Sequence, residues 1–202
     1  MKNIVILASL TVAFAVFLSA CGDTNINTNR LANQAGNAVN RTANMAGNAV
    51  NTISNTAAAM TTPSAEDFLK AAAQGGMAEV QLGNLAATKS QNAEIKAFGK
   101  LMAADHAKVN AEVKALGAKL KITLPTDVGS HRSTIDDLSK AQANFDKDYV
   151  NAMVKDHEDD VAAFQKQADN AADADVKAFA AKTLPTLKGH LEKIKAIQAK
   201  MK

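Results

Sequence analysis

The spacing of large apolar residues constrains the fold of this chain more than any other feature. Between residues 93 and 120 these residues recur at intervals of three, four and seven: Ile95, Phe98, Met102, Val109, Val113, Leu116 and Leu120. Such intervals place side chains on one face of an α-helix, which has 3.6 residues per turn. Comparable patterns cover residues 65–88, residues 143–168 and the segment after Asp173, and none shows the alternation of a β-strand. The sequence therefore predicts an all-α fold with four long helices.

Local signals indicate where these helices begin and how they connect. Ser64, followed three residues later by Asp67, is typical of a helix N-terminus, and Asp173 can cap the last helix. Residues 124–130 contain proline and glycine and interrupt the pattern, and a short helix over residues 133–139 is expected after them. Two helical hairpins joined by a longer crossover predict a four-helix bundle, for which the ferritin-like arrangement is the natural comparison.

The composition agrees with helices and excludes several classes of function. Aromatic residues make up only 4% of the chain and tryptophan is absent, whereas alanine, a strong helix former, dominates. The formal net charge of +3 is scattered among acidic residues, so no basic stripe marks a nucleic-acid partner. The single cysteine excludes an internal disulfide and a cysteine-based metal cluster.

The N-terminus has the features of an export signal. Residues 1–20 contain Lys2 and an apolar run over residues 4–17, which is too short for a comfortable membrane span. Residues 18–21, Leu-Ser-Ala-Cys, resemble the bacterial lipobox, in which the cysteine becomes the lipidated first residue. We therefore predict a signal peptide over residues 1–20 and a lipid anchor on Cys21, which attaches the protein to a membrane. In Gram-negative lipoproteins, an aspartate directly after the cysteine favours retention in the inner membrane. Here Gly22 follows the cysteine, so we expect the protein in the outer membrane, facing the periplasm.

Residues 21–62 differ in character from the rest of the chain. They are rich in Asn, Ala, Thr and Gly and contain an eleven-residue repeat, residues 30–40 followed by residues 41–51. Eleven residues make three helical turns, so the repeat could form a helix with a thin apolar stripe. Asn and Gly are poor helix formers, however, and their abundance favours a flexible tether. We expect the folded domain to occupy residues 63–202.

One potential metal ligand falls on the inward face of each predicted long helix, close to its midpoint: Glu79, His106, His157 and His190. Because midpoints of antiparallel helices share one level, these side chains are expected to form one layer in the bundle. Nitrogen ligands outnumber carboxylates, which favours a single zinc, iron or copper ion over a di-iron centre. The alternative is a purely structural polar layer that fixes the helix register.

Two aspartates extend this layer. Asp105 and Asp156 each precede one of the histidines, within the related segments Met-Ala-Ala-Asp-His and Met-Val-Lys-Asp-His. Either can be a further ligand or an outer partner that orients an imidazole on a neighbouring helix. The fourth histidine, His131, lies in the crossover and is expected to be exposed.

The order and spacing of these motifs resemble a known family. The matching segments are Gly-Gly-Met-Ala-Glu-Val-Gln-Leu-Gly at residues 75–83, Met102 with Asp105-His106, Phe145-Asp146 with Tyr149, Met153 and His157, and Leu184-Pro185 with His190-Leu191. Together they resemble an exported bacterial family catalogued as domain of unknown function 4142, described as a predicted outer-membrane protein with a ferritin-like fold. The resemblance covers residues 64–197 and implies this fold and address. It implies no activity.

Three functions are consistent with the sequence. The first is a periplasmic metal-binding bundle, the second a non-catalytic envelope or stress-related lipoprotein acting through a protein partner, and the third an oxidoreductase with a ferritin-like metal centre. The sequence has no phosphate-binding glycine loop and no Gly-x-Ser-x-Gly motif, and it assigns no catalytic residue. It does not identify the protein partner.

Overall fold

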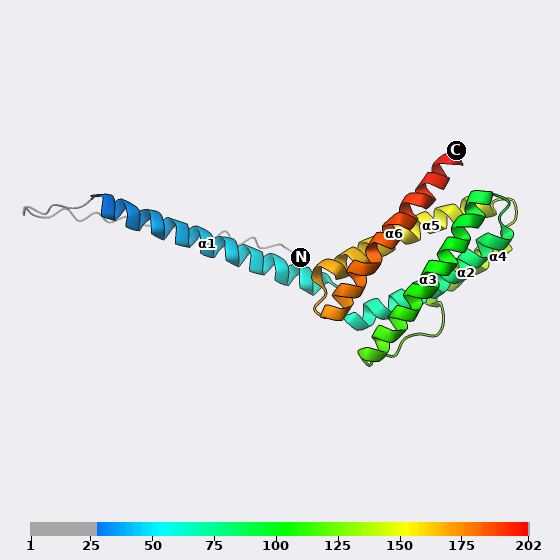
Figure 1. Cartoon of the computed structure of the whole chain (residues 1–202), viewed down its shortest axis with the longest axis horizontal. Coiled ribbons are helices and arrows are strands. Elements are labelled where there is room, and N and C mark those ends of the chain that lie inside the picture. Colours follow the sequence, from blue (N-terminus) through cyan, green and yellow to red (C-terminus); the bar gives the residue numbers. More distant parts are fainter. Residues whose placement is uncertain (1–27, 202) are drawn as a thin grey trace, which may run out of the picture. The chain divides into compact units, whose positions relative to one another are not determined.

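The computed structural model describes the backbone of residues 28–201 and the side chains of residues 36–52 and 62–201. The helices are α1 (Thr28–Thr61), α2 (Ala65–Lys89), α3 (Ala93–Lys119), the short 3₁₀ helix η1 (Gly129–His131), α4 (Arg132–Lys140), α5 (Phe145–Asn170) and α6 (Ala174–Lys200) (Figure 1). The described residues contain no strand, which confirms the all-α prediction. No helix among them has the length and apolarity needed to span a bilayer. The predicted signal peptide and Cys21 lie outside the described residues.

Helix α1 occupies the segment whose composition favours a flexible tether. The structure instead has the alternative conformation, a helix of 34 residues. The physical reason lies in the repeat, because eleven residues bring equivalent positions back to the same face after three turns. Val39 and Val50 are equivalent in this way and are 67% and 61% exposed. The chain divides into two compact units between Asn48 and Ala49, within this helix, and the second unit contains α2 to α6.

Three long helices of the second unit, α2, α3 and α6, begin where the sequence predicts. The side chain of Ser64 accepts a hydrogen bond from the backbone N–H of Asp67 at 3.1 Å. Asn92 caps α3 and Asp173 caps α6 in the same manner. Such caps satisfy backbone donors that have no partner within the helix. The crossover helix α4 is two residues longer than expected, and α5 begins at Phe145 instead of residue 143.

The helices pack as two hairpins, α2 along α3 and α5 along α6 (Figure 1). Two glycines allow a close approach of the two backbones in the α2–α3 hairpin. A Cβ atom at Gly83 would lie 2.6 Å from the carbonyl oxygen of Gly99, and a Cβ atom at Gly99 would lie 2.5 Å from the carbonyl oxygen of Gly83. Only residues without a side chain allow the two backbones this approach. The hairpins meet through α3 with α6 and α2 with α5, while η1 and α4 pack against α2.

The apolar core has two parts. One cluster joins the C-terminal half of α2 to the N-terminal half of α5 and includes Leu82, Phe98, Met102, Tyr149, Met153 and Ile194. The other lies toward the opposite ends of the same helices and includes Phe68, Leu69, Val113, Phe164, Phe179 and Leu187. On each of α2, α3, α5 and α6, one polar residue falls between the two clusters: Glu79, His106, His157 and His190. The core thus positions a buried polar layer between two apolar ones.

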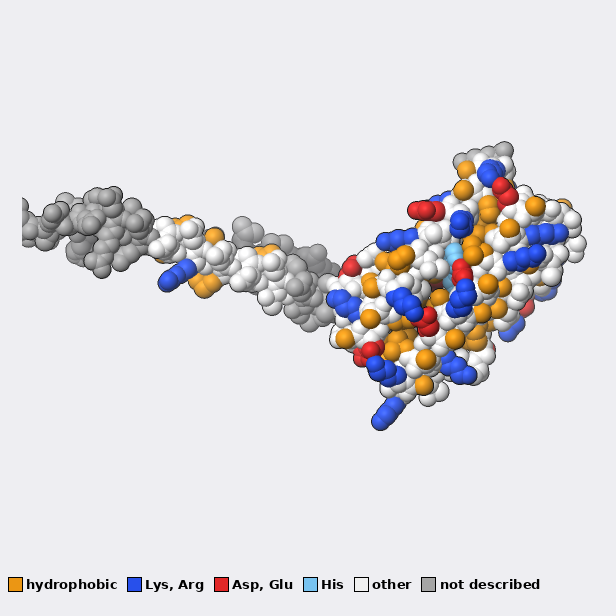
Figure 2. Space-filling model, viewed as in Figure 1, with side chains coloured by type: hydrophobic (Ala, Val, Ile, Leu, Met, Phe, Trp, Pro, Cys, Tyr) orange, Lys and Arg blue, Asp and Glu red, His pale blue; other side chains and the backbone are white. Residues whose placement is uncertain are grey.

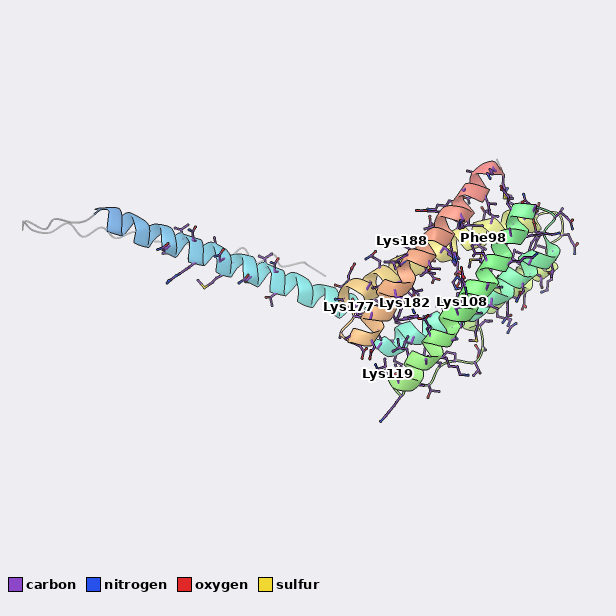
Figure 3. All side chains as sticks on the ribbon, viewed as in Figure 1. Phe98, Lys108, Lys119, Lys177, Lys182 and Lys188 are labelled. Atoms are coloured by element: carbon purple, nitrogen blue, oxygen red, sulfur yellow. The ribbon has the colours of Figure 1, made fainter. Side chains whose placement is uncertain are left out.

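Exposed ion pairs connect α3 to α6. Lys119 lies 2.6 Å from Asp175, Lys182 lies 2.9 Å from Glu112, and Lys200 lies 2.6 Å from Glu94. Figure 3 labels Lys119 on α3 and Lys182 on α6. Because all three pairs are exposed to solvent, each contributes at most about 1 kcal/mol. Packing of the two apolar clusters, rather than these pairs, holds the hairpins together.

Candidate metal centre

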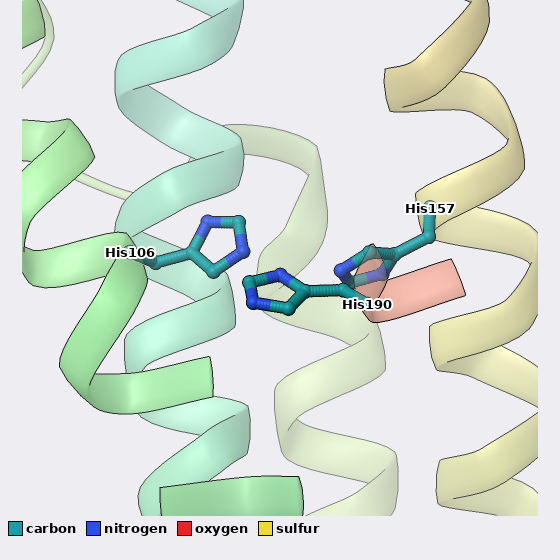
Figure 4. Close-up of side chains that lie close together, drawn as sticks. All are labelled: His106, His157 and His190. Carbon is teal, nitrogen blue, oxygen red and sulfur yellow. The ribbon is translucent and has the colours of Figure 1, made fainter. Parts of the chain in front are cut away.

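Three histidines from three helices meet in the polar layer. His106 comes from α3, His157 from α5 and His190 from α6, and their rings point toward one another (Figure 4). The ring centroids are 5.3 to 5.8 Å apart. One ligand atom of each ring lies within 4.8 Å of the others, and the side chains are 0 to 4% exposed. At this spacing, small movements of the side chains would let one ion contact all three rings.

Each imidazole is oriented by a partner on one of its two nitrogens. His106 Nδ1 lies 2.6 Å from Glu79 Oε2. His157 Nδ1 donates to the carbonyl oxygen of Met153, one turn earlier in α5, at 3.0 Å. His190 Nε2 lies 3.3 Å from Asp105 Oδ2. Metal-binding histidines commonly donate their second ring N–H to such carboxylates or carbonyls, which fixes the ring and its tautomer.

The other nitrogen of each ring is buried and has no hydrogen-bond partner among the described residues: His106 Nε2, His157 Nε2 and His190 Nδ1. Burial lowers the pKa of all three imidazoles, and it lowers the pKa of His157 to about 3. Near neutral pH a neutral ring that donates outward presents a bare lone pair inward. Leaving a buried acceptor unsatisfied costs about 1–3 kcal/mol. A bound cation would satisfy all three.

Glu79 completes the layer from α2. Its side chain is 1% exposed, and its Oε1 atom has no hydrogen-bond partner and lies 3.5 Å from His157 Nε2. Burial, and then the negative charge of Asp156, raise the pKa of Glu79. One carboxylate oxygen therefore orients His106, while the other faces the space between the rings. The structure thus brings together all four predicted residues. Glu79 contacts His106 through Oε2 and His157 through Oε1.

The two aspartates that accompany the histidines differ in position. Asp105 contacts the ring of His190, and its pKa is lowered by hydrogen bonding to Lys108 and then to His190. Asp156 faces the opposite side of the layer, where one of its oxygens lies within 4.8 Å of ligand atoms of Glu79 and His157. Burial raises the pKa of Asp156.

Sequence reasoning missed two groups beside this layer. Asp160 lies three residues after His157 on α5, and burial, followed by the charges of Glu79 and Asp156, raises its pKa. The interval of three was the available signal, because it places both residues on neighbouring positions of the helix surface.

The expectation that His131 is exposed is wrong. Its side chain is only 32% exposed, and its Nδ1 atom lies 3.9 Å from Asp156, because η1 packs against α2 beside the layer.

Comparison with known proteins establishes the family. The domain of unknown function DUF4142 matches residues 50–197, which is most of the chain. The chain belongs to this family. A search of curated proteins gives no match. Among solved structures, the chain is similar to the crystal structure of a DUF305 fragment from Deinococcus radiodurans, with a TM-score of 0.60 and 13% sequence identity, over 69% of this chain and 97% of the fragment. At this identity the similarity concerns the fold alone.

Proposed function

We propose that this DUF4142 protein binds one transition-metal ion through His106, His157 and His190. The observation that carries the proposal is the set of three buried ring nitrogens that face one another without partners, while the second nitrogen of each ring is held by an acceptor. A purely structural polar layer would be expected to satisfy its own donors and acceptors. This layer leaves three acceptors of the same kind at one point.

The donor set narrows the choice of ion. Three imidazoles suit zinc, iron(II) and copper, and they are a poor site for magnesium or calcium, which prefer oxygen. Glu79 Oε1 faces the same space and can supply a fourth ligand. A small cavity of about 10 Å³ beside Glu79 and His106 has room for about one water molecule. The three histidine side chains are buried, which favours holding an ion over turning over a substrate, and we assign no catalytic residue.

We further propose that α2, α3, α5 and α6 form a ferritin-like four-helix bundle, with residues 63–202 as its domain. Residues 1–20 would be a lipoprotein signal peptide, and residues 21–62 would connect the domain to a lipid on Cys21 in the outer membrane, facing the periplasm. Antiparallel hairpins with ligands at the helix midpoints support the bundle. The lipobox-like segment at residues 18–21 supports the anchor.

Elemental analysis tests the metal proposal directly. The chain is purified without a polyhistidine tag, in detergent, and its content of zinc, iron and copper is measured after dialysis and after addition of each metal. We expect one ion per chain in the wild type and none in a His106→Leu, His157→Leu double variant. If the wild type takes up no stoichiometric metal, the layer is structural, and the alternative of an envelope protein acting through a protein partner takes its place.

The anchor is tested separately by a Cys21→Ser substitution. The serine cannot carry the lipid, so a fatty-acid analogue supplied to the producing bacterium should label the wild type and leave the variant unlabelled as an uncleaved precursor. Equal labelling of both proteins would refute the assignment of Cys21.

A further inference from the structure

The histidine site is buried, so an ion must reach it through the protein. Four carboxyl groups lie around the histidines, those of Glu79, Asp105, Asp156 and Asp160. The side chain of Asp105 is 23% exposed, but its contact is with His190 Nε2, whereas Asp156 lies beside ligand atoms of Glu79 and His157 that have no hydrogen-bond partner. The side chain of Asp156 is 23% exposed, whereas that of Glu79 is 1% exposed. Asp156 also lines a groove of about 290 Å³, together with His131, Thr134 and Asp159. The side chain of Asp159 at the rim of this groove is 68% exposed, so the groove opens to solvent.

Asp156, Glu79 and His157 have the geometry of a second cation position. One ligand atom of each lies within 4.8 Å of the others. Two of these residues are fully buried and present atoms without hydrogen-bond partners, Glu79 Oε1 and His157 Nε2, which lie 3.5 Å apart. Buried polar atoms without a partner call for a group that satisfies them, and one cation beside this pair would contact both. The cluster therefore rests on two unsatisfied buried atoms as well as on its acidic residues.

We propose that Glu79, Asp156 and His157 form an outer position for a divalent cation, through which the ion passes from the groove to the three histidines. This inference rests on the proposed function. The outer position has two oxygens and one nitrogen, so it accepts a wider range of divalent ions than the inner one and binds borderline metals less tightly. His157 and Glu79 serve both positions, so the ion keeps these ligands while it exchanges the carboxylate of Asp156 for the rings of His106 and His190.

A second route must be considered, along the seam between α3 and α6. Figure 2 shows the edge of a histidine side chain there, beside an acidic one. The contact between Asp105 and His190 lies between these two helices, but the nitrogen that faces Asp105 is Nε2, which is already held. The unpartnered Nδ1 atom is on the other side of the ring. An ion arriving along this seam would need His190 to release Asp105 and rotate, whereas at Asp156 it meets free ligand atoms.

Stopped-flow loading with Co²⁺ tests the outer position, because a Co²⁺ ion on three histidines has a characteristic visible spectrum. The full chain is used in detergent, without a polyhistidine tag. Asp156→Asn should slow loading by roughly tenfold or more, since it removes the carboxylate that first contacts the ion. The final spectrum and the stoichiometry should match those of the wild type, because the three histidines are unchanged. Asp156→Glu, which keeps a carboxylate, should restore most of the rate.

A matched variant separates this role from a general effect of charge. Asp159→Asn removes the same charge from the same groove and should load at the wild-type rate. The inference is overturned if Asp156→Asn loads as fast as the wild type, or if Asp159→Asn is equally slow. It is also overturned if Asp156→Asn loses the ion altogether, since Asp156 would then be an inner ligand. A wild type that shows no Co²⁺ spectrum would instead refute the proposed metal site itself.

Discussion

A single hydrogen bond decides which nitrogen of each histidine is available. Asp105 holds His190 from the side facing solvent, and its own low pKa keeps it ionised and able to accept. We expect Asp105→Ala to weaken metal binding by about 10- to 100-fold, the usual cost of losing an outer partner of a ligating histidine. Asp105→Asn retains an acceptor and should weaken it less. Isothermal titration with zinc measures both, and equal affinities for the wild type and Asp105→Ala would contradict the assigned role.

The lowered pKa of His157 predicts a specific pH dependence in the metal-free protein. Its pKa is about 3 in the folded state and about 6.5 in the unfolded state, so between these values the unfolded chain binds a proton that the folded one does not. Its contribution to the free energy of unfolding is therefore zero above pH 6.5 and becomes unfavourable as the pH falls toward 3. The raised pKa values of Glu79 and Asp160 act in the opposite direction, so only a comparison of variants isolates His157.

His157→Leu should remove this part of the fall in the free energy of unfolding at low pH. Urea unfolding of the wild type and the variant, in the presence of a chelator, should show a difference that grows in favour of the leucine as the pH is lowered. At pH 4 the growth relative to pH 7 should be on the order of 3 kcal/mol. Parallel stability curves for the two proteins would show that His157 is not held neutral by burial.

The sequence was sufficient to place Glu79, His106, His157 and His190 in one layer, because helical periodicity fixes which face each occupies. It could not show which ring nitrogen is held, since that depends on side-chain rotamers and on the rotation of each helix. Nor could it place His131, whose position follows from the path of the crossover over α2. Contacts between helices decide these details.

The packing of α2 against α3 depends on the contact between Gly83 and Gly99. A methyl group at either position would meet backbone atoms at 2.6 Å or less, and backbone cannot move aside as a flexible side chain can. We expect Gly83→Ala to lower the free energy of unfolding by about 1–3 kcal/mol, even though alanine is the better helix former. Thermal unfolding followed by circular dichroism measures the change.

Gly189 in α6 is the matched control. It is also within a helix, but a Cβ atom there would have no neighbour within 4 Å. Gly189→Ala should therefore stabilise the protein by about 0.5–1 kcal/mol through helix propensity alone. If both substitutions change stability in the same direction, close packing at Gly83 is not what distinguishes the two sites.

Helix ends and helix α1 show how far elements can be predicted. Ser64 and Asp173 mark helix starts because a cap is a local interaction between neighbouring residues. The conformation of α1 has no such marker. Its many Asn and Gly residues favour a flexible tether, whereas its three-turn repeat favours a helix. The prediction relied on composition, and the structure has the helix.

For the whole molecule, the polar layer separates two apolar clusters that would otherwise be continuous. The layer lies near the middle of α2, α3, α5 and α6, so a metal ion there would join α3, α5 and α6 directly, and α2 through Glu79. The metal-free protein carries unsatisfied buried atoms at this level instead. Stability should therefore depend on metal throughout the bundle and in one cooperative transition.

Melting experiments with and without metal test this dependence. At a free metal concentration a hundred times the dissociation constant, binding stabilises the folded state by about 2.7 kcal/mol, which for a domain of this size raises the melting temperature by roughly 5–10 °C. A chelator should reverse the shift, and His157→Leu should show none. Between pH 7 and pH 6 the shift should fall less than for a site of solvent-exposed histidines, because burial lowers the pKa of all three imidazoles and so reduces competition from protons. A melting temperature that zinc, iron(II) and copper all leave unchanged would mean that the layer holds no ion and that its unpartnered atoms are a cost of the fold.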